Sequence, residues 1–280
     1  MLVATTIKEV KEQVRQWKKE GLTIGLVPTM GYLHEGHASL IKRAVLENDR
    51  VIVSDFVNPI QFGPKEDLGT YPRDFDADCK LCSDLGTDLI FHPEPSEMYA
   101  PDFHSYVGVD TLSTELCGKS RPIHFNGVCT VVSKLFNISE ADRAYFGQKD
   151  AQQLAIVKRM VRDLNFNIEI VGCPIIREND GLAKSSRNTY LSKEAREKAT
   201  ILHKALEKGE AMVRSGEKDA NKVVSSISNI IESEPLAKID YVEVVDWNEL
   251  QKTDVIDGPI LTAVAVYIDN VRLIDNFIVE

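Results

Sequence analysis

Two histidines three residues apart are the first residues of this chain whose type and spacing suggest chemistry. His34 and His37 lie in the stretch Pro28–His37, between a short apolar run and a segment that predicts a helix. A helix N-terminus favours phosphate through its N–H groups and dipole, and residues three apart share one face. We therefore expect both imidazoles to donate to phosphate oxygens and to stabilise the charge that develops as pyrophosphate leaves. Histidines that only cap the helix are the alternative, and a metal pair lacks an evident third ligand.

A second polar stretch, Phe146–Gln153, also follows an apolar run and precedes a predicted helix. Gly147 allows close backbone approach to a ligand, Asp150 suits a helix N-cap, and Lys149 carries a mobile charge that can reach phosphate. A lysine after a strand is often only a solvated side chain. Its expected position at the same sheet edge as the histidines favours a binding role.

A third polar stretch, Lys184–Asn188, combines two serines with an arginine. The hydroxyls, successive backbone N–H groups and the guanidinium of Arg187 together suit an anion. A plain surface loop is the alternative. A His-x-x-His helix start combined with a distant Lys-Ser-Ser loop is more specific than either part alone.

Short apolar runs that alternate with helical segments organise the first 176 residues. This pattern is typical of a parallel sheet covered by helices on both faces, which binds ligands beyond the carboxyl ends of its strands. We therefore predict a Rossmann-like α/β domain of nucleotidyltransferase type over residues 1–176, which binds nucleotide and substrate. Its strands are expected over 23–27, 50–57, 88–91, 143–146 and 167–171, and its helices over 6–20, 38–44, 76–85, 128–136 and 151–164.

The pattern changes near Arg177, where Glu178–Gly181 forms a turn signal. We predict a second, smaller α+β domain over residues 177–280, which would act as a C-terminal lid. Its expected elements are two helices from Ser192 onward, broken at 215–216, a strand over 239–245, and a hairpin of 260–268 with 271–279.

The net charge and the cysteines exclude several classes of protein. A formal net charge of −10 argues against a large nucleic-acid surface. The sequence shows neither a signal peptide nor an apolar run near the roughly 18 residues that a membrane span needs. Cys79 and Cys82 have the spacing of a redox or zinc pair, but no second pair completes a site. We expect ordinary thiols in a reducing cytoplasm and no membrane partner.

Taken together, these stretches resemble the pantoate–β-alanine ligase family. The matching motifs run from the first predicted strand into the start of the second domain, in the family's order. They are Pro28–His37, Phe56–Gly63, Tyr71–Arg73, Arg121–Phe125, Phe146–Gln153 and Ser185–Asn188.

The resemblance implies a ligase that condenses (R)-pantoate with β-alanine, with ATP as a substrate and Mg²⁺ as a cofactor. In that family the pantoate carboxylate attacks the α-phosphorus, and the amine of β-alanine then attacks the pantoyl adenylate. AMP and pyrophosphate are released. The resemblance also implies a homodimer whose other partners are these small molecules.

Carried over residue by residue, the resemblance implies a set of site residues. The catalytic side chains are His34, His37, Lys149 and Arg187. The ATP site comprises Met30, Gly31, Tyr32, Leu33, His34, Glu35, Gly36, His37, Gly147, Gln148, Lys149, Asp150, Ile176, Lys184, Ser185, Ser186 and Arg187. Pantoate and β-alanine are assigned to Gln61 and Gln153. Asp78 is the candidate Mg²⁺ ligand, although an acidic residue on a helix is more often only solvated.

Lys184 departs from the family's pattern, which has an apolar residue, commonly Met or Leu, before the Ser-Ser-Arg-Asn run. We expect only the backbone of Lys184 to matter and its side chain to point to solvent. The alternative is an additional cation over the triphosphate.

Two other functions compete with the ligase. One is another member of the same superfamily, such as an aminoacyl-tRNA synthetase-like protein or a nucleotide adenylyltransferase. The contexts of Gln61 and Gln153 argue against it, as does the lack of a basic or zinc-bearing tRNA-binding extension. The other is an ATP-binding sensor module, which the complete set of phosphate-binding residues disfavours.

Overall fold

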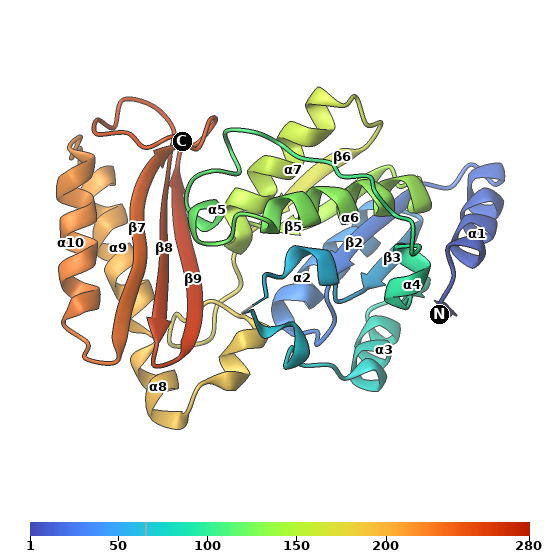
Figure 1. Cartoon of the computed structure of the whole chain (residues 1–280), viewed down its shortest axis with the longest axis horizontal. Coiled ribbons are helices and arrows are strands. Elements are labelled where there is room, and N and C mark those ends of the chain that lie inside the picture. The colour runs from blue at the N-terminus through green and yellow to red at the C-terminus, as the bar shows by residue number, and fades with distance from the viewer. Residues whose placement is uncertain (65) are drawn as a thin grey trace. The chain divides into compact units, whose positions relative to one another are not determined.

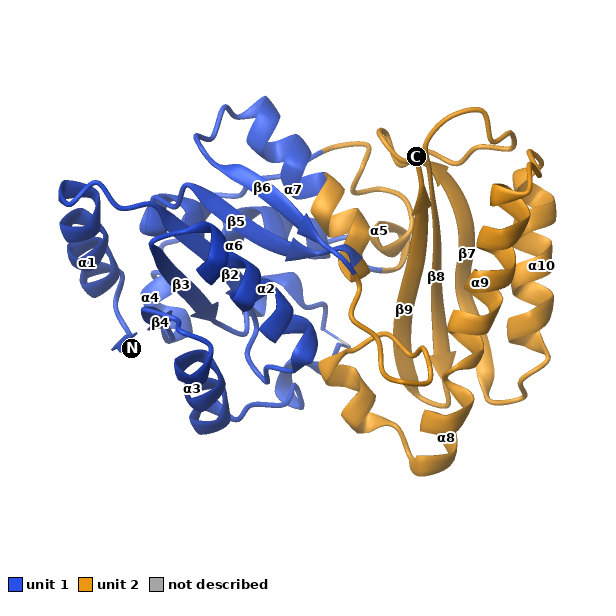
Figure 2. Ribbon diagram, turned by 180° about the vertical axis from the view of Figure 1, so that it is seen from behind, with its two compact units in different colours: residues 1–109, 121–148, 156–174 blue, residues 110–120, 149–155, 175–280 orange. Residues whose placement is uncertain are grey.

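The computed structural model describes residues 1–64 and 66–280, which form two compact units (Figure 2). Segments of the two units alternate along the chain, whereas the sequence suggested a single division between residues 176 and 177. The first unit comprises residues 1–109, 121–148 and 156–174, and the second comprises residues 110–120, 149–155 and 175–280.

The first unit is built on a six-stranded parallel sheet with the strand order β1-β4-β3-β2-β5-β6 (Figure 1). This confirms the predicted Rossmann-like α/β class. The edge strand β1 was not predicted, because three residues are too few to show a periodicity. The strands are β1 (Leu2–Ala4), β2 (Ile24–Thr29), β3 (Arg50–Asp55), β4 (Leu89–Phe91), β5 (Arg143–Gly147) and β6 (Glu169–Cys173).

Helices connect these strands, as the alternating pattern predicted. The first of them begins with a reciprocal cap, since the hydroxyl of Thr6 accepts from the N–H of Glu9 and the carboxylate of Glu9 accepts from the N–H of Thr6. The helices are α1 (Ile7–Lys19), α2 (Glu35–Glu47), α3 (Phe75–Asp84), α4 (Pro95–Met98), α6 (His124–Ser139) and α7 (Ala151–Asp163).

An apolar cluster holds α2 against the sheet of the first unit. Leu40, Ile41 and Ala44 of α2 are buried with Val27 and Val53 of the neighbouring strands. Full burial of one such aliphatic side chain stabilises the fold by roughly 1.5–3 kcal/mol. This packing fixes the start of α2 relative to the carboxyl ends of β2 and β3.

The second unit contains a three-stranded antiparallel sheet of β7 (Ala237–Asp246), β8 (Ile260–Ile268) and β9 (Val271–Val279). The hairpin of β8 and β9 has the predicted bounds, with Ile268 paired to Val271. α9 and α10 lie side by side against this sheet (Figures 1 and 2). The helices of this unit are α5 (Cys117–Ser120), α8 (Lys193–Lys198), α9 (Ile201–Arg214) and α10 (Ala220–Glu232).

Among the described residues, no helix is both long enough and apolar enough to cross a membrane.

Candidate active site

The order of the strands places two of the predicted motifs next to each other in the first unit. In the sheet, β3 and then β4 lie on one side of β2, and β5 and then β6 lie on its other side. β2 and β5 are paired in parallel, with Leu26 opposite Ala144. Ligands of open α/β sheets bind where the strand order reverses in this way. β2 is followed by the loop that leads into the His-x-x-His helix start, and β5 ends at Gly147, so both motifs lie at this point.

The loop between β2 and α2 turns sharply before the histidines. Gly31 and Tyr32 both have left-handed backbones, with φ values of +76° and +51°. A Cβ atom built on Gly31 would overlap Oδ1 of Asp55. Glycine is therefore required at position 31 both by the turn and by the close approach of Asp55.

His34 and His37 are held at the first turn of α2 by hydrogen bonds to the backbone. Nδ1 of His34 accepts from the N–H of Gly36 at 3.1 Å, and Nδ1 of His37 accepts from the N–H of His34 at 3.3 Å. An imidazole nitrogen that accepts carries no proton, so in a neutral ring the proton is on Nε2. Both rings therefore cap the helix through Nδ1, and the N–H of each neutral ring is the Nε2–H. Their centroids are 4.1 Å apart.

Gln61 is the buried residue of a 3₁₀ turn, Pro59–Gln61, and lies next to Met30. Its amide nitrogen is 3.0 Å from the sulfur of Met30, and its amide oxygen accepts from the side chain of Asn58 at 2.9 Å. α6 packs closely against this turn, since a Cβ atom built on Gly127 would lie 2.5 Å from Cα of Gln61. The structure thus brings the predicted substrate residue Gln61 to the predicted ATP residue Met30 within one unit.

The residues after β5 form a 3₁₀ turn, Gln148–Asp150, and Gln153 is in the first turn of α7. Apart from Gly147 itself and its two chain neighbours, no described residue has an atom within 4 Å of a Cβ built on Gly147, so the space beside this backbone is open. Within the second unit, the carbonyl of Lys149 accepts from the side chain of Asn276 at 2.9 Å. The ammonium group of Lys149 is 3.7 Å from the carboxylate of Asp150.

The stretch from Lys184 to Arg187 is joined to Ile176 by one backbone hydrogen bond within the second unit. The N–H of Lys184 donates to the carbonyl of Ile176 at 2.9 Å, and the hydroxyl of Ser185 accepts from the N–H of Arg187 at 3.3 Å. The ammonium group of Lys184 is 3.0 Å from the carboxylate of Glu178, and the lysine side chain is only 19% exposed. The expectation that this side chain points to solvent was therefore wrong, because a carboxylate on the same turn attracts it.

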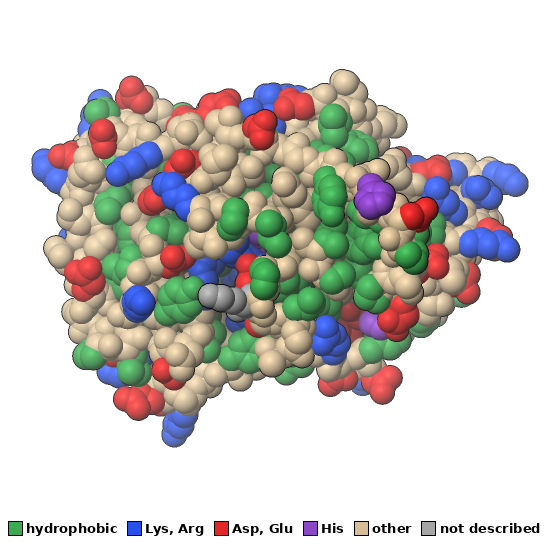
Figure 3. Space-filling model, viewed as in Figure 1, with side chains coloured by type: hydrophobic (Ala, Val, Ile, Leu, Met, Phe, Trp, Pro, Cys, Tyr) green, Lys and Arg blue, Asp and Glu red, His purple; other side chains and the backbone are tan. Residues whose placement is uncertain are grey.

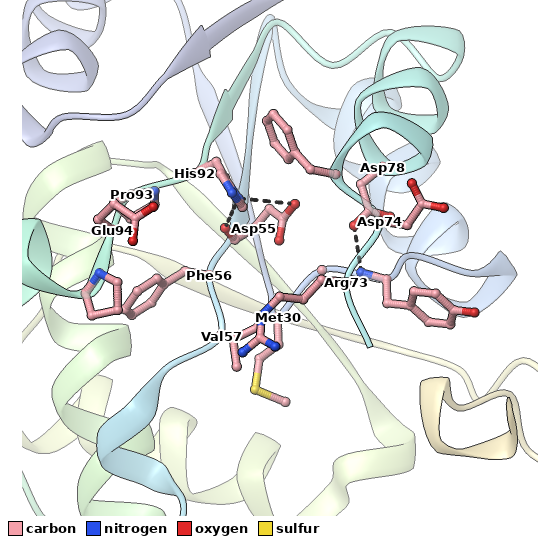
Figure 4. A pocket seen from close by; sticks show the side chains of 14 residues that line it. Met30, Asp55, Phe56, Val57, Arg73, Asp74, Asp78, His92, Pro93 and Glu94 are labelled. Carbon is pink, nitrogen blue, oxygen red and sulfur yellow. Dashed lines mark hydrogen bonds and ion pairs between the residues drawn. The ribbon is translucent and has the colours of Figure 1, made fainter. Parts of the chain in front are cut away.

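A pocket of about 240 Å³ adjoins the loop after β2 in the first unit (Figure 4). Asp55, at the carboxyl end of β3, and His92, just after β4, point toward each other there, with 3.5 Å between a carboxylate oxygen and Nδ1. Hydrogen bonding to Asp55 raises the pKa of His92. Sequence reasoning missed this pair, although an aspartate that ends an apolar strand was a signal for it.

Asp78, the candidate metal ligand, lies in α3 at the edge of the same pocket and is 3% exposed. Its two carboxylate oxygens accept from the N–H groups of Tyr32 and Leu33, each at 2.6 Å. Burial, with help from the carboxylates of Asp55 and Asp74, raises the pKa of Asp78 to about 6, although the two backbone donors lower it.

The predicted site residues divide between the two compact units. The first unit holds residues 30–37, Gln61, Asp78, Gly147 and Gln148, and the second holds Lys149, Asp150, Gln153, Ile176 and residues 184–187. A parallel sheet with a His-x-x-His helix start at its switch point defines a nucleotide-binding α/β protein.

Comparisons with known proteins identify the family within this class. Residues 2–278 match the family model of pantoate-beta-alanine ligase. The chain is 61% identical over 277 residues to the pantothenate synthetase of Clostridium botulinum (strain Loch Maree / Type A3), with 99% of each chain covered. It is 59% identical over 280 residues to that of Enterococcus faecalis, with 100% of this chain and 99% of the other covered.

Solved structures of other proteins support the same family assignment. The crystal structure of pantothenate synthetase from Thermus thermophilus matches with a TM-score of 0.94 and 42% identity, covering 99% of each chain. That of pantoate-beta-alanine ligase from Francisella tularensis, complexed with beta-gamma ATP and β-alanine, matches with a TM-score of 0.80 and 36% identity, covering 99% of this chain and 97% of the other. The chain therefore belongs to the pantoate–β-alanine ligase family and is an enzyme, as its motifs predicted. The roles of the individual residues stay predictions.

Proposed function

We propose that this chain condenses (R)-pantoate with β-alanine through a pantoyl adenylate, with release of AMP and pyrophosphate. The observation that carries the proposal is the position of His34 and His37 at the switch point of the sheet, in the same unit as the contact between Gln61 and Met30. A phosphate-binding helix start next to an amide that can bind a hydroxyl or carboxylate suits an acid that attacks ATP. Membership of the family supports this reaction.

In the first half-reaction the pantoate carboxylate attacks the α-phosphorus of ATP. Gln61, fixed by Asn58 and Met30, hydrogen-bonds pantoate, and Gln153 is its second amide partner. His34 and His37 donate from Nε2 to phosphate oxygens, where charge builds up as pyrophosphate departs. In the second half-reaction the amine of β-alanine attacks the pantoyl carbonyl and AMP leaves.

Residues that the family resemblance assigns provide the remaining contacts with ATP in this proposal. Lys149 and Arg187 provide positive charge for the triphosphate, and Ser185 and Ser186 provide hydroxyls. Ile176 contacts adenine through its backbone. Carboxylate and triphosphate repel each other, so these cations offset the cost of bringing them together.

Mg²⁺ enters with ATP in this proposal and is not held by a preformed protein cage. The described residues contain no group of three or more His, Cys, Asp or Glu side chains that could hold a metal ion. Both oxygens of Asp78 already accept from backbone N–H groups. Protein-bound Mg²⁺ is commonly held by substrate phosphates with one or two carboxylates.

The proposed assembly is a homodimer in the cytoplasm whose other partners are small molecules. Two-fold dimers are the commonest oligomers. All five cysteines are free thiols, which suits a reducing compartment. On the face in Figure 3, acidic and basic side chains of the described residues are interspersed, which does not favour a polyanion such as nucleic acid.

ATP–pyrophosphate exchange with a panel of acids tests the proposal. Exchange should appear with (R)-pantoate alone, and AMP should accumulate only when β-alanine is added. Exchange supported by amino acids and not by pantoate would point to a different adenylating enzyme. AMP production that needs both substrates, without any exchange, would contradict a free-standing adenylate step.

A further inference from the structure

Asp78 joins α3 to the loop that leads into the two histidines. Its carboxylate oxygens are each 2.6 Å from a backbone nitrogen, one of Tyr32 and the other of Leu33. Leu33 is followed directly by His34, the N-cap of α2. α3 is itself anchored at its start, where Asp74 accepts from the N–H of Ala77 at 3.1 Å. The carboxylate therefore fixes the backbone immediately before the phosphate-binding turn.

The carboxylate of Asp78 is the acceptor for two consecutive N–H groups of this loop. Gly31 and Tyr32 are consecutive left-handed residues, and such a conformation is uncommon and costly for a residue with a side chain, such as Tyr32. The N–H groups of Tyr32 and Leu33 both point at the one carboxylate. Two N–H donors facing one carboxylate form charge-assisted hydrogen bonds, which are stronger than neutral ones. Without Asp78 the N–H groups of Tyr32 and Leu33 would lose this acceptor, and the strained turn would lose two of the hydrogen bonds that hold it.

Both carboxylate oxygens are used in this way, which argues against a direct metal role. A metal ion on Asp78 would have to share oxygens that the two N–H groups already orient, and the described residues offer no group of three His, Cys, Asp or Glu ligands. We propose that Asp78 is a positioning residue: it holds the backbone of Tyr32 and Leu33 and thereby sets the orientation of His34 and His37 for adenylation. This inference rests on the proposed function, because it concerns the rate of the same half-reaction.

The substitution Asp78→Asn separates positioning from metal binding. An amide keeps one acceptor but turns an N–H₂ group toward the other backbone donor, so one of the two hydrogen bonds is lost. A displacement of about 1 Å at reacting groups lowers rates on the order of 100-fold. We expect single-turnover pantoyl adenylate formation at saturating substrates to fall about 10- to 100-fold. The Michaelis constant for pantoate and the half-saturating Mg²⁺ concentration should change less than about threefold.

Asp76→Asn is the matched control. Asp76 is exposed in the first turn of the same helix, so this change removes the same charge without touching the loop. The Asp76→Asn variant should form the pantoyl adenylate at the wild-type rate. If Asp78→Asn instead raises the half-saturating Mg²⁺ concentration tenfold or more, and excess Mg²⁺ restores the rate, Asp78 is a metal ligand and the proposal is wrong. An unchanged adenylation rate would also overturn it.

Amide hydrogen exchange in the wild-type protein gives a test that does not depend on the variant folding. The N–H groups of Tyr32 and Leu33 should exchange at least about 100-fold more slowly than unstructured amides, both with and without Mg²⁺. Fast exchange of both amides would show that Asp78 does not hold them. A wild-type protein without ATP–pyrophosphate exchange would contradict the proposed function, and the amide measurement would still decide the role of Asp78.

Discussion

Replacing Lys184 with methionine tests whether this position acts through its backbone. The ammonium group of Lys184 is 3.0 Å from the carboxylate of Glu178, and the two side chains are 19% and 30% exposed. Methionine removes this ion pair but keeps the N–H that donates to the carbonyl of Ile176. Arg196 remains 3.9 Å from the same carboxylate, so Glu178 keeps a cationic neighbour.

The expected magnitudes follow from these contacts. A partly exposed ion pair contributes about 0.2–1 kcal/mol, so Lys184→Met should lower the free energy of unfolding by no more than that. kcat/KM for ATP should change by less than about tenfold, which corresponds to roughly 1.4 kcal/mol. Arg187→Met should lower it by about 100-fold or more, because it removes a forked donor to phosphate.

The assay combines initial rates at low and high ionic strength with urea unfolding of each variant. Lys193→Met is the control, since Lys193 is exposed in the same unit and is not a site residue. High salt should weaken any long-range effect of removing a positive charge and should affect this control and Lys184→Met alike. A loss of a hundredfold or more in correctly folded Lys184→Met would refute the backbone-only interpretation and place the ammonium group on the triphosphate.

Four further predictions test other parts of the site. His37→Ala should slow adenylate formation by about two to three orders of magnitude and change ATP affinity much less, as single-turnover kinetics would show; a defect confined to the ATP dissociation constant would contradict this. Gln153→Ala should raise the Michaelis constant for pantoate more than that for ATP or β-alanine, and unchanged pantoate dependence would remove it from the substrate site. Gly127→Ala places a Cβ atom 2.5 Å from Cα of Gln61. It should lower the free energy of unfolding by about 1–3 kcal/mol in urea and weaken pantoate binding. Unchanged stability and pantoate binding would show that α6 shifts without cost. The pKa of Asp78 is raised from 3.8 to about 6, mainly by burial, so its contribution to stability is complete below pH 3.8 and is lost as the pH rises through 6. The stability of the wild type relative to Asp78→Asn should therefore be about 1 kcal/mol greater near pH 5 than near pH 7.5, and an opposite slope would show that the carboxylate is stabilised by folding.

Most of the elements could be predicted because their signals are local. The alternation of apolar strands with helices predicted the parallel sheet, and the turn at Asp269 gave the hairpin of β8 and β9 its bounds. The motif around His34 and His37 could be placed at a helix start after a strand without knowledge of any distant contact. Such features depend on the periodicity and turn preferences of neighbouring residues, so they can be predicted from the sequence alone.

The tertiary structure decided which distant groups meet. Asp78 is 46 residues from Tyr32 in the sequence, yet its carboxylate accepts from that N–H, and no periodicity could have revealed this. The sequence pointed to Asp55 at the end of a strand but not to its contact with His92, and it did not show the alternation of segments between the two units. The physical reason is the same in each case. Buried polar groups find their partners only when strands and helices pack, and that packing depends on the whole chain rather than on any one segment.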